Sequence, residues 1–108
     1  MNPMMQAMQQ LQLMQQKMAE TQAALGNRFV TEEVSGGLVR VTANGHGAIT
    51  KLEIKPEAIN AEEREMLEDL VITAVNKAIE SAKAMAAHEM EQATGGMMPD
   101  IPGLNLPF

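Results

Sequence analysis

The sequence has few of the residues from which active sites are built. It contains no cysteine, tryptophan or tyrosine, and Phe29 and Phe108 are its only aromatic residues. Without cysteine there are no disulfides, thiol nucleophiles or thiolate metal sites, which fits a reducing compartment. Two aromatic rings are too few for the stacking platforms that bind single-stranded nucleic acid. These absences favour a binding protein over an enzyme.

Long apolar runs and a basic leader are also missing. No segment approaches the ~20 uninterrupted apolar residues that a membrane span needs. The opening stretch, MNPMMQAMQQ, lacks the basic start and the apolar run of a secretion signal. With 108 residues, the chain is the size of one ordinary domain. We therefore expect a single soluble intracellular domain with no membrane partner.

Positive charge is scarce, and the acidic residues are unevenly placed. The net charge is −6, which does not favour nucleic-acid binding. Residues 1–55 hold five basic and four acidic groups, a net of +1, whereas residues 56–108 hold three basic and ten acidic groups, a net of −7. The nearly neutral N-terminal half leaves room for local contacts with phosphates.

Side chains that could support catalysis or bind a metal are isolated. His46 lies in a glycine-flanked turn and His88 in a polar stretch, and no second histidine stands at ligand spacing from either. The carboxylates of residues 62–69 fall in the first turns of a predicted helix, where they favour the helix dipole. The N-terminal methionines could hold soft copper, but thioethers at heptad spacing more often fill cores and interfaces. We expect no catalytic site, metal, cofactor or small-molecule substrate.

Residues 1–26 are predicted to form a first helix. Asn2 caps free backbone N–H groups and Pro3 suits the first turn, while Gly26-Asn27 is typical of a helix end. Glutamines fill much of the remaining surface. The apolar side recurs at alternating steps of three and four residues, which makes a heptad seam: Met4, Ala7, Leu11, Met14, Met18, Thr21 and Leu25.

Residues 28–55 alternate between apolar and polar side chains, which is typical of strands with one buried and one exposed face. Glycine-rich turns at 35–37 and 44–47 divide the segment into three strands, and Pro56 ends the last one. The exposed face is predicted to carry Arg40 and Lys51. The buried face is predicted to carry Val39, Val41, Leu52 and Ile54.

Residues 60–94 are predicted to form a second helix. Asn60 and Glu63 resemble a capping box at its start, and Gly95-Gly96 breaks it. Residues 95–108 are rich in proline and glycine and are predicted to form an irregular tail. The predicted fold class is α+β, in the order α-β-β-β-α.

The second helix is too long for the sheet that it covers. A six-residue strand spans ~20 Å, whereas the helix would be ~50 Å long, so its overhanging turns would expose apolar surface. Exposed patches of this kind usually mark an interface. We predict a homodimer; the alternative is that the first helix folds back over this surface. The predicted contact residues are Ala74, Ala78, Ile79, Ala82 and Met85.

Four features together resemble the YbaB/EbfC family of bacterial nucleoid-associated proteins. A Gln/Met-rich helix is followed by GGLVRVTANGHGAITKLEIKPEAI, EMLEDLVITAVNKAIESA and TGGMMPDIPGLNLPF, and together they cover nearly the whole chain. The resemblance implies the α-β-β-β-α fold and a homodimer whose long helices project like tweezer arms. It also implies binding of double-stranded DNA in the cytoplasm, within the bacterial nucleoid. On this chain the projecting parts would lie around Gln9–Lys17 and Lys77–His88.

Two functions remain open from the sequence. One is an architectural dimer that binds duplex DNA by backbone or groove contacts and influences nucleoid organisation and gene expression. The other is a dimeric adaptor that binds another protein, with DNA binding incidental. Phosphate binding weakens steeply as salt rises, whereas apolar partner binding does not. In the first reading, the candidate phosphate contacts are Lys17, Arg28, Arg40, Lys51, Lys55 and Lys83.

Overall fold

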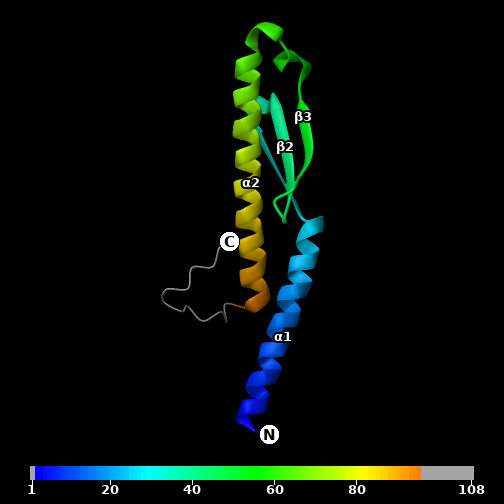
Figure 1. The fold of residues 1–108 in the computed structure, drawn as a ribbon, viewed down its shortest axis with the longest axis vertical. Coiled ribbons are helices and arrows are strands. Elements are labelled where there is room, and N and C mark those ends of the chain that lie inside the picture. The colour runs from blue at the N-terminus through cyan, green and yellow to red at the C-terminus, as the bar shows by residue number, and fades with distance from the viewer. Residues whose placement is uncertain (1, 96–108) are drawn as a thin grey trace, which may run out of the picture.

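Two long helices and a three-stranded sheet make up an elongated molecule of 72 × 28 × 17 Å (Figure 1). The computed structural model describes residues 2–95. The sheet lies beside the N-terminal half of α2, and α1 lies beside its C-terminal half. The predicted α-β-β-β-α order is confirmed, with α1 (Pro3–Ala24), β1 (Phe29–Val34), β2 (Val39–Asn44), β3 (Ile49–Ile54) and α2 (Arg64–Thr94).

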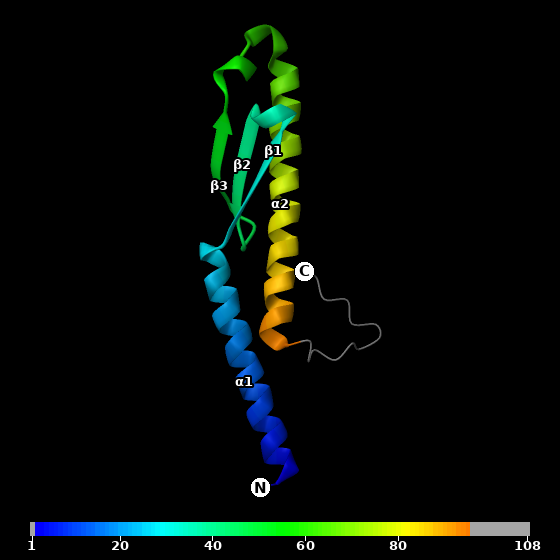
Figure 2. The same cartoon turned by 180° about the vertical axis from the view of Figure 1, so that it is seen from behind.

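The first helix, α1, begins at its predicted cap and projects beyond the end of α2. The side-chain oxygen of Asn2 accepts a hydrogen bond from the backbone N–H of Met4 at 3.1 Å, and Pro3 occupies the first turn. No residue of α1 is buried. The N-terminal half of α1 extends past the C-terminal end of α2 in both views (Figures 1 and 2). The first turn of α1 therefore has no neighbouring element among residues 2–95.

The heptad seam of α1 is used over only part of its length. Leu25, at its C-terminal end, is 1% exposed, and Met14 and Met18 are half-buried. Leu11 is 53% exposed and Met4 is 70% exposed. The seam packs where α2 lies beside it and stays open where α2 has ended.

The sheet is an antiparallel meander in the order β1-β2-β3. On its inner face, Val39, Val41 and Ala43 of β2 are fully buried. Opposite Val41, the register places Glu32 of β1 and Leu52 of β3. Helix α2 covers this face mainly over β1 and β2 (Figure 2). The alternation predicted from the sequence thus assigns the faces correctly.

Three alanines bring α2 close to the sheet. Ala74, Ala78 and Ala82 are fully buried and form the core with the inner side chains of β2. Their small side chains let the helix backbone approach the strands. The sequence predicted that they lie on a surface free to meet a second copy. That expectation is corrected, since the sheet of the same chain covers all three.

The third strand, β3, is only partly covered. Because α2 lies over β1 and β2, the inner side chains of β3 remain accessible. Leu52 is 47% exposed and Ile49 is 39% exposed, although both lie on the inner face. The prediction that Leu52 is buried is therefore wrong for the single chain.

The turn between β2 and β3 holds the end of α1. The backbone N–H of Gly45 donates to the carbonyl oxygens of Leu25 and Arg28, both at 2.9 Å. A Cβ atom on Gly45 would lie 2.6 Å from the Leu25 oxygen. Only glycine fits this close approach without displacement. The same turn places the Nε2 atom of His46 2.6 Å from the carbonyl oxygen of Gln22.

Candidate nucleic-acid interface

The outer face of the sheet carries Arg40 and Lys51, as predicted, but neither cation is free. Arg40 Nη2 lies 3.0 Å from Glu33 Oε2, and Arg40 Nη1 lies 3.8 Å from Glu53 Oε2. Lys51 Nζ lies 3.2 Å from Glu53 Oε1. Two cations and two carboxylates share this face, so their charges cancel. A phosphate would have to compete with these carboxylates and would meet no net positive field.

The sequence already contains the reason for this neutrality. Antiparallel register places Glu33 and Glu53 directly opposite Arg40 on the two neighbouring strands. Opposite charges at facing positions attract one another across a sheet. Exposed pairs of this kind are worth at most about 1 kcal/mol each. Their effect here is on the charge of the surface rather than on stability.

Arg28 links the start of β1 to α2. Its Nη2 donates to Glu89 Oε1 at 2.7 Å, and the Glu89 side chain is only 23% exposed. Binding of Arg28 to a phosphate would leave a largely covered carboxylate without its partner, which costs more than breaking a surface pair. Arg28 therefore serves the packing of α2.

Further along α2, a second polar cluster joins the helix to β1. Ser81 Oγ donates to Glu32 Oε1 at 2.8 Å. Lys77 Nζ lies 3.7 Å from Glu32 Oε2 and 3.4 Å from the carbonyl oxygen of Glu33. The inward-facing carboxylate of Glu32 is thus satisfied by α2. Lys77, like Arg28, is engaged within the chain.

Lys17, Lys55 and Lys83 are exposed and have no ion pair within residues 2–95. Lys55 follows β3 at the end of the sheet far from α1. Lys17 lies on α1 and Lys83 on the C-terminal half of α2. The two elements that project from the sheet therefore each present an unpaired cation.

The exposed polar side chains of α1 before Glu20 carry no negative charge. Between Pro3 and Ala19 the only charged residue is Lys17; the first carboxylate is Glu20. Amide side chains donate and accept hydrogen bonds, and they contact both phosphates and base edges in DNA complexes. Six glutamines before Lys17 are exposed: Gln6, Gln9, Gln10, Gln12, Gln15 and Gln16.

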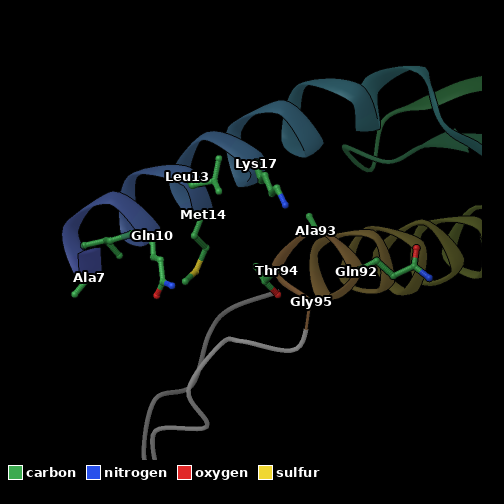
Figure 3. A pocket seen from close by; sticks show the side chains of 10 residues that line it. Ala7, Gln10, Leu13, Met14, Lys17, Gln92, Ala93, Thr94 and Gly95 are labelled. Atoms are coloured by element: carbon green, nitrogen blue, oxygen red, sulfur yellow. The ribbon is translucent and has the colours of Figure 1, made fainter. Parts of the chain in front are cut away.

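A groove separates α1 from the end of α2 (Figure 3). It has a volume of about 550 Å³. In the figure, Gln10 and Met14 point from α1 toward the end of α2, and Lys17 points toward Ala93. The sequence alone does not predict this groove, because its form depends on where α2 ends beside α1. The lining residues are Ala7, Gln10, Leu11, Leu13, Met14, Lys17, Gln92, Ala93, Thr94 and Gly95.

Within residues 2–95 there is no cluster of three or more histidine or carboxylate side chains that could hold a metal ion. Neither helix in this part of the chain combines the length and apolar character needed to span a bilayer. Residues 2–95 therefore present ion pairs on the sheet, cations without an ion pair on the helices, and the groove between α1 and α2.

Comparison with known proteins places the chain in a family. Residues 1–97 match the family model described as the YbaB/EbfC DNA-binding family. The chain belongs to this family. The resemblance seen in the sequence is thereby confirmed. The family binds DNA and is not an enzyme family, so the prediction that this protein is not an enzyme is confirmed as well.

Proteins similar to this family member come from several bacteria. A nucleoid-associated protein from Pelotomaculum thermopropionicum is 47% identical over 97 residues, covering 90% of each chain. One from Polynucleobacter necessarius is 46% identical over 101 residues, covering 94% of this chain and 92% of the other. One from Bartonella bacilliformis is 41% identical over 108 residues, covering 100% of this chain and 99% of the other.

A crystal structure of an uncharacterized protein from Helicobacter pylori shares the fold. The two align with a TM-score of 0.60 at 20% sequence identity, covering 72% of this chain and 90% of that chain. At this identity the likeness concerns the fold alone.

Proposed function

We propose that this protein binds duplex DNA in the bacterial nucleoid as a homodimer, and that the contacts come from the projecting helices rather than from the sheet. One observation carries the choice of surface: within residues 2–95, Lys17 and Lys83 on the helices have no ion pair, while Arg40 and Lys51 are neutralised on the sheet. Membership of a DNA-binding family and similarity to nucleoid-associated proteins support DNA as the ligand.

In this proposal α1 supplies most of the contacts. Its surface from Pro3 to Ala19 carries no carboxylate, so it can approach a phosphate backbone without local repulsion, despite the net charge of −6. Lys17 would neutralise a phosphate, and the glutamines would hydrogen-bond to phosphates or groove edges. Few cations imply modest affinity, and contacts to phosphates do not distinguish base sequences.

We place the dimer contact on the uncovered side of β3 and the flank of α2 beside it. Ile49 and Leu52 of β3 are 39% and 47% exposed, and Ile72 of α2 is 58% exposed. Ile72, Val75 and Ile79 follow one another at steps of three and four, so they share a strip of the helix. An exposed apolar surface of this extent is typical of an interface.

Two of the contact residues predicted from the sequence, Ile79 and Met85, lie on different sides of α2. Ile79 is half-buried and belongs to the proposed strip. Met85 lies three residues after Ala82, so it faces the same side of α2 as the core alanines. We therefore keep Ile79 in the proposed contact and leave Met85 out.

A titration of fluorescent duplex DNA at two salt concentrations tests DNA binding itself. The proposal predicts binding of unrelated duplexes with similar affinity, which weakens as salt rises because bound cations release counterions from the DNA. The exposed methionines and leucines of α1 favour a second candidate, a dimeric adaptor that binds another protein. Absence of DNA binding at low salt would reject the proposal in favour of that adaptor.

A further inference from the structure

The groove between α1 and α2 leaves apolar side chains without neighbours in residues 2–95. Leu11 and Leu13 line it and are each 53% exposed. Met8, one turn before Leu11, is 59% exposed. Such a run of exposed apolar side chains along a groove usually marks a site that another segment covers.

We propose that residues 96–108 of the same chain bind in this groove. Gly95, the last described residue, lines the groove, so the following segment starts at its edge. Gly95 has φ 60° and ψ 27°, a left-handed conformation that ends α2 and turns the chain away from the helix axis.

The segment has enough length and apolar character to cover the groove. Its 13 residues can reach up to ~40 Å when extended, whereas the α1 side of the groove, from Ala7 to Lys17, spans only ~15 Å. Nearly half of its residues are apolar and could replace water on the leucines: Met97, Met98, Ile101, Leu104, Leu106 and Phe108.

Residues 96–108 and the groove carry side-chain charges of opposite sign. Asp100 is the only charged side chain in residues 96–108. Lys17 is the only charged residue that lines the groove, and it has no ion pair in residues 2–95. A segment seated on Leu11 and Leu13 would bring its one acid to the one basic side chain of the site.

Binding within one chain is favoured over binding to a second copy. Because the segment is joined directly to the groove at Gly95, its local concentration there is in the millimolar range typical of short tethers. A segment from another copy would have to compete with it. If Lys17 also contacts DNA, as the proposed function holds, the bound segment competes with DNA for it.

Paramagnetic relaxation in the full chain, without DNA, tests the inference. The chain has no cysteine, so Asn105→Cys gives one attachment site for a nitroxide and leaves the apolar residues intact. We expect strong loss of amide signal at Gln10, Leu13 and Ala93, and little loss at Thr31 on the sheet. A label on Glu57→Cys, at the opposite end of the molecule, should leave the groove signals unchanged.

Two further samples separate the alternatives. Dilution with excess unlabelled chain leaves an effect within one chain unchanged, whereas an effect between copies falls in proportion. Leu13→Asp, which lines the groove but lies off the heptad seam, should abolish the effect of the Asn105 label. The inference would be overturned if the Asn105 label left the amide signals of the groove unchanged. It would also be overturned if the signal loss disappeared on dilution with unlabelled chain. Because no DNA is present, failure here says nothing against DNA binding.

Discussion

The Nε2 atom of His46 lies 2.6 Å from the backbone carbonyl oxygen of Gln22. That oxygen belongs to the last turn of α1, where carbonyl groups lack partners within the helix. A side chain from the β2–β3 turn therefore caps α1, next to the bonds from the Gly45 N–H to Leu25 and Arg28. We infer that this turn fixes the direction in which α1 leaves the sheet.

The first prediction concerns this cap. His46→Ala removes the bond to Gln22 and should lower the free energy of unfolding by about 1 kcal/mol, as for a typical hydrogen bond. The amides in the last turn of α1 should also exchange faster with solvent. Thermal unfolding and hydrogen exchange measure the two effects. His88→Ala, on an exposed position of α2, is the control; equal effects of both substitutions would contradict the capping role.

The second prediction concerns the close approach of α2 to the sheet. Ala78 is fully buried against β2, so Ala78→Leu forces extra volume into a packed site. We expect a loss of about 1–3 kcal/mol in the free energy of unfolding, the usual range for overpacking. Urea unfolding provides the measurement. Ala84→Leu adds the same volume at an exposed position of α2 and should change stability little; a tolerated Ala78→Leu would show that the core is loose.

The third prediction locates the dimer contact. Leu52→Asp and Ile72→Asp place a charge on surfaces that are already half exposed in one chain, so each chain should still fold. In the proposed contact the charge would be buried without a partner, which is strongly unfavourable. Sedimentation should show monomers for both variants. Ala84→Asp adds the same charge at an exposed position of α2 that lies five residues from Ile79 and therefore off the strip, so it should leave the dimer intact; dimers in all three variants would move the contact elsewhere.

Much of the fold follows from local sequence rules. The alternation around Val39 and Val41 fixes the faces of the sheet, and Asn2, Pro3 and Gly95 mark helix ends through capping chemistry that acts over a few residues. These features need no knowledge of the tertiary structure. Element order could therefore be predicted from the chain alone.

The predictions of burial that were wrong depend on how far one element extends over another. Ala78 belongs to an apolar band of α2 with two sides, and the sequence does not say which side the sheet covers. Leu52 has the pattern of a buried residue, yet α2 lies over the other two strands. Leu11 has the same seam position as Leu25, yet α2 ends before reaching it.

Some features of the candidate site can likewise be predicted from the sequence, whereas others require the tertiary structure. Lys17 and Lys83 could be named as exposed cations from their helical positions. The pairing of Arg40 with Glu33 and Glu53 requires the strand register, which sets whether a surface cation is free or neutralised. The groove beside Lys17 requires the relative placement of both helices.

In the proposed function the helices, and not the sheet, contact DNA. This choice of surface is tested most directly by the salt dependence of duplex binding in two double variants, Lys17→Gln/Lys83→Gln and Arg40→Gln/Lys51→Gln. Both remove two positive charges per chain, so their effects on net charge are matched. Each lost phosphate contact should reduce the slope of log affinity against log salt by about 0.9.

The measurement is fluorescence anisotropy of a labelled duplex over a series of salt concentrations, with circular dichroism to verify folding of each variant. The account predicts weaker binding and a flatter slope for Lys17→Gln/Lys83→Gln, with a slope close to that of the unmodified protein for Arg40→Gln/Lys51→Gln. A flatter slope for the sheet variant together with an unchanged slope for the helix variant would contradict it.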